Sequence, residues 1–199
     1  MNTYILATLL FVHALALSAQ EEVKVAVEHL DLYGTLLTPA KKTNKAILII
    51  SGSGTTDRDG NTKPMYTNDG LRKLAEELTG LGFATVRFDK RGVGKSVSAS
   101  TTAEELRFEH LISDASAWIT FLKDRYEDIT VIGHSQGALV GMVAIQHNEV
   151  NRFISLAGLS EDAYTTVKRQ LANQPKVVVD AAYPLLESLK NGFKVKNIP

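Results

Sequence analysis

The segment from Ile129 to Ala144 constrains the fold more than any other part of the sequence. A short run of apolar and β-branched residues, typical of a buried strand, leads directly into GHSQG at residues 133–137, and an apolar helix-forming stretch follows. A strand that turns this abruptly into a helix strains the backbone of its central residue and leaves no room for side chains two positions to either side. Glycines occupy both of those positions. The pattern therefore predicts a sharp turn that presents the Ser135 hydroxyl at the carboxyl end of a strand, with a helix N-terminus behind it.

The composition is that of an ordinary globular chain with a single domain. Of the 199 residues, 44% are hydrophobic, and 22 basic side chains balance 22 acidic ones. This balance indicates neither a nucleic acid nor an anionic membrane surface as a partner. The sequence has no cysteine, and its histidines show no metal-binding spacing, so no metal or other cofactor is predicted. No feature of the sequence indicates an oligomeric state.

Residues 1–19 are predicted to form a secretory signal peptide. Residues 4–17 are apolar apart from Thr8 and His13, and small residues around Ala19 precede an acidic segment. The apolar run of roughly 14 residues is short for a membrane span, with a signal anchor as the alternative. We therefore expect an exported protein, periplasmic or extracellular, with no stable membrane span after the signal peptide is cleaved.

Strand-like and helix-like segments alternate after this leader. Residues 23–27 and 32–37 are expected to form an antiparallel hairpin, followed by strands at 46–50, 84–88, 129–132 and 152–156. Helices are expected at 70–81, 102–126 and 136–146, and more polar ones at 161–173 and 175–190. In the helix at 102–126, Thr102 would be the N-cap and Glu105 would complete a capping box. The alternation predicts an α/β fold with a mostly parallel sheet and helices on both faces.

Three motifs at the ends of successive strands resemble those of the α/β-hydrolase superfamily, in particular its exported carboxylesterase and dienelactone-hydrolase-like members. SGSGTTDRDG at 51–60 stands where the family has its oxyanion loop, and DKRGVGKS at 89–96 is similar to the family's D-x-R-G-x-G-x-S turn. GHSQG at 133–137 matches the nucleophile elbow. The resemblance covers about residues 23–158 and implies the α/β-hydrolase fold together with a serine-dependent acyl transfer.

The resemblance also implies roles for individual residues. Ser135 would be the nucleophile, and the backbone N–H groups of Gln136 and Ser53 would stabilise the oxyanion, with Gly52 as the second choice in the loop. The family often has a histidine in front of this loop, where the sequence has Ser51. The predicted function is the hydrolysis of small-molecule carboxylic esters, with small acyl groups, through an acyl-enzyme on Ser135.

Two charged clusters in these loops have structural explanations. Asp89 and Arg91 are expected to brace neighbouring loops by charge-assisted hydrogen bonds rather than to act in catalysis. Asp57, Arg58 and Asp59 would form a self-satisfied surface network, the commoner case, or else shape the pocket. Neither glycine-rich loop is predicted to bind a nucleotide. A Walker A motif that ends at residues 94–96 would need glycine at position 89, and a dinucleotide-binding motif that begins at Gly52 would need glycine at position 57. Both positions are aspartate.

The residues that activate the serine are not found at the positions that the family uses. There the acid and then the histidine follow the serine in the chain. The only later histidine is His147, which a regular helix would place about 18 Å from Ser135 along its axis. Residues 159–199 resemble the beginning of the helical cap that many of these enzymes insert after strand six. We therefore expect a fragment that is inactive by itself, with a hydrolase core at 20–158, a partial cap at 159–199, and strands seven and eight missing.

Other functions are compatible with the same motifs. A peptidase or a thioesterase of the same fold would use the same nucleophile and oxyanion donors. A non-catalytic binding protein could retain the scaffold after losing the residues that activate the serine.

Overall fold

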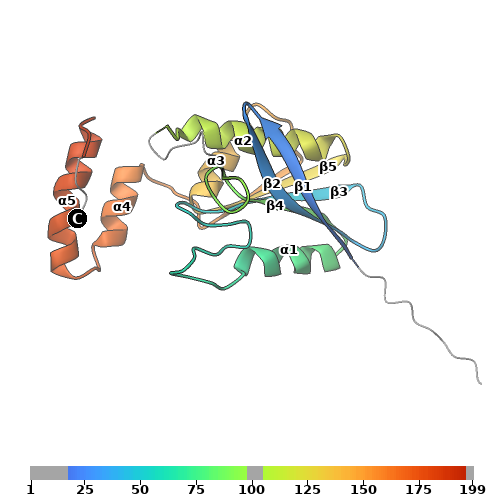
Figure 1. Cartoon of the computed structure of the whole chain (residues 1–199), viewed down its shortest axis with the longest axis horizontal. Helices are drawn as coiled ribbons and strands as arrows, with labels where there is room; N and C mark the ends of the chain where they lie inside the picture. Colours follow the sequence, from blue (N-terminus) through green and yellow to red (C-terminus); the bar gives the residue numbers. More distant parts are fainter. Residues whose placement is uncertain (1–17, 98–104, 196–199) are drawn as a thin grey trace, which may run out of the picture.

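The computed structural model describes residues 18–97 and 105–195 (Figure 1). The first 17 residues of the predicted signal peptide and the predicted N-cap Thr102 lie outside these ranges. None of the helices that are described is both long and apolar enough to cross a membrane.

Six strands form one mixed sheet in the order β1-β2-β4-β3-β5-β6. They are β1 (Ala19–Val27), β2 (Leu30–Thr38), β3 (Lys45–Ile50), β4 (Ala84–Phe88), β5 (Asp128–His134) and β6 (Arg152–Leu156). β1 and β2 form the expected antiparallel hairpin, and β2 also pairs antiparallel with β4. β3, β4, β5 and β6 run parallel to one another, so the mostly parallel sheet is confirmed.

Helices cover both faces of this sheet, as the alternation of elements predicted (Figure 1). α1 (Gly70–Gly80) packs on one face, whereas α2 (Phe108–Lys123) and α3 (Gln136–Ala144) pack on the other. α4 (Ala163–Leu171) and α5 (Lys176–Lys190) form a hairpin that lies apart from the sheet, at the left of Figure 1. This hairpin falls within the segment predicted to be a cap, and that role stays a prediction.

The start of α2 differs from the sequence prediction. Glu105 lies in a turn that precedes the helix rather than in its first turn. Arg107 is the N-cap instead, and its backbone N–H donates a hydrogen bond to His110 Nδ1 at 3.2 Å. The helix therefore begins several residues later than expected. Its first free backbone N–H, that of Arg107, is satisfied by the His110 side chain three positions further along.

The central strand β3 contributes to two hydrophobic cores. Successive side chains of a strand point to opposite faces, so Leu48 and Ile50 pack with α2 and α3, whereas Ile47 and Ile49 pack with α1. This double burial explains the continuous apolar run of the sequence. It also fixes the carboxyl end of β3, where the SGSGTTDRDG loop begins, next to the end of β5.

Trp118 holds α2 against the sheet. Its ring is fully buried, stacks on Phe88 with the ring centroids 5.5 Å apart, and meets the edge of Phe121 at 5.3 Å. A Cβ atom at Gly34 of β2 would lie only 2.7 Å from Trp118 Cη2. The absence of a side chain at position 34 therefore makes room for the largest residue of the core.

Candidate active site

Ser135 occupies the sharp turn between β5 and α3, as the sequence predicted. Its φ of 53° and ψ of −120° are a strained combination for a residue with a side chain. A Cβ atom at Gly133 would overlap the backbone of the first turn of α3. At Gly137, a Cβ atom would lie 2.5 Å from the carbonyl oxygens of Ile50 and Ser51. Both glycines are therefore required by the close approach of β3, the turn and α3.

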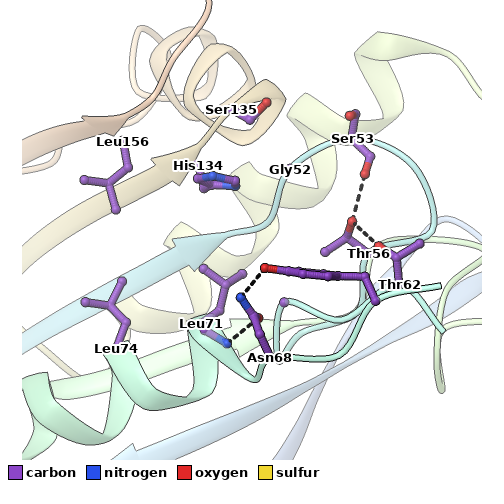
Figure 2. A pocket seen from close by; sticks show the side chains of 13 residues that line it. Gly52, Ser53, Thr56, Thr62, Asn68, Leu71, Leu74, His134, Ser135 and Leu156 are labelled. Atoms are coloured by element: carbon purple, nitrogen blue, oxygen red, sulfur yellow. Dashed lines mark hydrogen bonds between the residues drawn. The ribbon is translucent and has the colours of Figure 1, made fainter. Parts of the chain in front are cut away.

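Ser135 borders a cavity of about 460 Å³ at the carboxyl ends of the strands (Figure 2). Leu71, Leu74 and Leu156 form its apolar wall, and Thr56 and Thr62 lie at its opposite side. Among the described residues, no aspartate, glutamate, lysine or arginine lines this cavity. The cavity is therefore suited to a small, uncharged and partly apolar molecule.

The predicted oxyanion donors lie on two sides of Ser135. Gln136 is the first residue of α3, so its N–H has no acceptor within the helix and points out of a helix N-terminus, which favours anions. Ser53 lines the cavity from the loop after β3. That loop closely approaches the turn, since a Cβ atom at Gly52 would lie 3.4 Å from Ser135 Cβ. The structure therefore brings the predicted residues together, and their catalytic roles stay predictions.

His147 is remote from Ser135, as the sequence predicted. Ser135 precedes the N-terminus of α3, whereas His147 lies beyond its C-terminus, and a helix of nine residues is about 14 Å long. His134 lines the cavity next to Ser135. Within residues 18–97 and 105–195, however, no side chain forms a hydrogen bond with Ser135 Oγ. The same ranges contain no cluster of histidine and acidic side chains that could hold a metal ion.

The charged cluster at residues 57–59 is largely an internal brace, so the self-satisfied surface network favoured by the sequence is wrong. Arg58 is only 9% exposed, and its Nε and Nη2 donate to Asp89 Oδ2 at 3.0 and 2.7 Å. Asp59 accepts a hydrogen bond from Arg87 of β4 at 2.8 Å. Asp57 accepts from two backbone N–H groups of its own loop. Arg58 and Asp59 are thus satisfied from outside the cluster, by β4 and the turn that follows it. None of the three residues lines the cavity itself.

The structural role predicted for Asp89 and Arg91 is confirmed. Arg91 donates two hydrogen bonds to Asp114 of α2, at 2.5 and 2.8 Å, and a longer one to Glu28 at 3.3 Å. The Asp114 carboxylate beside it raises the pKa of Arg91. Besides binding Arg58, Asp89 accepts a hydrogen bond from the backbone N–H of Lys95. The DKRGVGKS turn therefore ties the hairpin, the SGSGTTDRDG loop and α2 together.

Lys90 is the residue near the site that the sequence analysis missed. Its side chain is buried, and its Nζ donates hydrogen bonds to the carbonyl oxygens of Gly52 and Gly54, the latter at 2.8 Å. Burial lowers the pKa of Lys90 to about 8. The D-x-R-G-x-G-x-S pattern leaves this position variable, so no local signal marks Lys90 as buried.

The class of protein follows from comparison with known families. The sequence model of the family described as serine aminopeptidase, S33, matches residues 68–196, which is more than half of the chain. The chain therefore belongs to this hydrolase family. None of the curated protein sequences compared with the chain gives a significant match.

Solved structures with the same fold include known hydrolases. An esterase from Pyrococcus furiosus is 23% identical, with a TM-score of 0.60 over 84% of this chain and 64% of that one. An α/β-hydrolase from Penicillium sp. sh18 is 17% identical, with a TM-score of 0.60 over 90% of this chain and 69% of that one. A dienelactone hydrolase from Anabaena variabilis is 24% identical, with a TM-score of 0.53 over 71% and 64%. At these identities the likeness shows the fold, which is the predicted α/β-hydrolase fold. The chain spans about 64% of the length of the Pyrococcus esterase.

Proposed function

We propose that Ser135 is the nucleophile of a serine hydrolase that cleaves small, neutral carboxylic esters. The observation that carries this proposal is the strained turn that holds the Ser135 hydroxyl at the edge of an uncharged cavity, beside the N-terminus of α3. Ser135 Oγ would lose its proton to a base and bond to the ester carbonyl carbon; the ester C–O bond would then break, and the base would return the proton to the departing alcohol. Water would hydrolyse the resulting acyl-enzyme and release the carboxylic acid. The backbone N–H groups of Gln136 and Ser53 would stabilise the oxyanion.

The chemistry of the cavity favours esters over peptides, although the family is described as an aminopeptidase family. An aminopeptidase holds the free α-ammonium of its substrate, and a charged group that leaves water needs an opposite charge or several hydrogen bonds. No carboxylate lines the cavity in the described part of the chain. Asp59 and Asp69, which lie in the adjacent loop, are paired with Arg87 and Arg72. A neutral ester would instead place its apolar group against the leucines of the cavity.

Binding of phenylboronic acid tests the role of Ser135 without requiring proton transfer during turnover. Boron accepts the serine oxygen and becomes a tetrahedral anion, which needs the hydroxyl and the oxyanion donors. We expect measurable binding by calorimetry, and Ser135→Ala should weaken it at least about tenfold, or about 1.4 kcal/mol. Ser113→Ala, at an exposed position of α2 outside the cavity lining, is the matched control and should leave the affinity unchanged. Equal affinity in Ser135→Ala would remove Ser135 from the site.

Hydrolysis of p-nitrophenyl acetate tests whether the 199 residues are sufficient for turnover. We expect the chain to be no faster than its Ser135→Ala variant, because no described side chain is hydrogen-bonded to Ser135 Oγ to take its proton. The measurement is the initial rate at neutral pH, followed by absorbance. A clear rate that depends on Ser135 would show that the chain contains its own base. If both turnover and boronate binding are absent, a non-catalytic binding protein is favoured.

A further inference from the structure

Lys90 lies behind the loop that carries Ser53, and within the described residues its ammonium forms no ion pair. It is 7% exposed and donates to two backbone carbonyls, those of Gly52 and Gly54, which flank Ser53 in the chain. The Ser51 hydroxyl, at the position where the family often has a histidine, makes only a long contact of 3.5 Å with a loop carbonyl. Lys90 is therefore a principal anchor of this part of the loop.

The Gly52 carbonyl and the Ser53 N–H belong to one planar peptide group. In a trans peptide these two groups point in opposite directions, so a donor that holds the carbonyl also fixes the direction of the N–H. A hydrogen bond to the oxygen also polarises the group and makes its N–H a stronger donor. Such control matters in this loop, because glycines at positions 52 and 54 would tolerate other orientations of the same peptide.

We propose that Lys90 is a positioning residue of the oxyanion site, which aims and polarises the Ser53 N–H toward the carbonyl oxygen of an ester bound at Ser135. This inference rests on the proposed function of Ser135 and Ser53. Lys90 itself binds the far side of the Gly52–Ser53 peptide and makes no contact with the reacting atoms.

If Lys90 only filled space in the core, a buried ammonium that is not paired with a carboxylate would be less favourable than an apolar side chain. Desolvation of the ammonium disfavours the charged form, whereas an apolar side chain of similar length would fill the same space without that cost. The acidic groups around Lys90 are already paired, since Asp89 binds Arg58, and Asp114 of α2 binds Arg91. The positive charge of Lys90 is therefore available to the loop carbonyls, and through them to the oxyanion site.

The first test follows the Ser53 amide of the full chain by ¹H–¹⁵N NMR between about pH 6.5 and 9.5. The Lys90 ammonium loses its charge as the pH rises through its pKa of about 8, so the Ser53 amide proton should change its shift with that midpoint. Lys90→Met should abolish this transition, whereas Lys123→Met, at an exposed position of α2, should leave it unchanged. Lys90→Arg, which keeps both the donors and the charge, should hold the amide near its low-pH shift.

Other ionisable groups near Lys90 must be distinguished from it in this titration. His134 approaches Gly52 from the elbow, and the Asp89 and Asp114 ion pairs lie on the elements packed around Lys90. A transition that persists in Lys90→Met arises from one of these groups and would overturn the proposal. If Lys90→Met does not fold, the wild type and Lys90→Arg still decide the matter. The proposal is overturned if the Ser53 amide of the wild type shows no transition near pH 8, or if that of Lys90→Arg keeps the transition.

The second test measures phenylboronic acid affinity at pH 7. Removal of one oxyanion donor typically costs about 10²–10³-fold in rate, and a donor that is kept but misaimed costs less. We expect Lys90→Met to bind about 10- to 100-fold more weakly while it keeps a cooperative urea transition, and Lys90→Arg to restore most of the affinity. Unchanged affinity in a folded Lys90→Met variant contradicts the proposal. If the wild-type chain binds no boronate, the proposed function fails, while the Ser53 titration still decides whether Lys90 controls that N–H.

Discussion

Substitution of Asp89 by alanine is expected to lower the free energy of unfolding by about 3–5 kcal/mol, because it leaves the buried charge of Arg58 without its main partner. The Asp89 carboxylate accepts hydrogen bonds from the Arg58 guanidinium, from the Arg58 backbone N–H and from the Lys95 backbone N–H. The Arg58 donors gain little water when the carboxylate is removed, since Arg58 is only 9% exposed. Urea denaturation followed by circular dichroism measures the loss.

An exposed ion pair supplies the control for this substitution. Asp180 of α5 pairs with Lys176 at 2.5 Å, with both side chains largely in solvent. Asp180→Ala should therefore change the free energy of unfolding by less than about 1 kcal/mol. If Asp89→Ala were as mild as Asp180→Ala, the Arg58–Asp89 brace would contribute little to stability.

Substitution of Gly137 by valine is expected to cost at least about 4 kcal/mol and to leave little folded protein. Overpacked cores usually lose about 1–3 kcal/mol because neighbouring side chains can move aside. Here the new Cβ would lie 2.5 Å from two backbone carbonyl oxygens at the end of β3, the central strand of the parallel part of the sheet. These atoms are held by the sheet, so the strain must be relieved by displacing α3 or the turn at Ser135.

Gly80→Val is the matched control for the elbow glycine. A Cβ at Gly80, at the exposed end of α1, would meet no heavy atom within 4 Å. Its urea midpoint should therefore stay close to that of the wild type, while Gly137→Val loses the cooperative transition. A normal transition in Gly137→Val would show that the turn is looser than the structure indicates.

Most of the fold follows from local patterns in the sequence. The bounds of β4 and β6 agree with those predicted. The predicted start of α2 was wrong because two positions that could begin the helix, Thr102 and Arg107, lie within six residues of each other. Local propensity does not decide between them. The candidate nucleophile was found because its glycines are a steric requirement of one turn.

By itself, the sequence determined the order of the elements, the mostly parallel sheet and the turn that carries Ser135, since each depends on residues close together in the chain. Only the tertiary structure showed that Arg58 and Lys90 are buried anchors of the loop at the candidate active site. The Arg58–Asp89 pair joins residues 31 apart in sequence, and Lys90 reaches a carbonyl 36 residues away. The burial of a charged side chain depends on which distant groups neutralise it or accept its hydrogen bonds. Those groups become neighbours only when β3 and β4 align in the sheet and bring their following loops together.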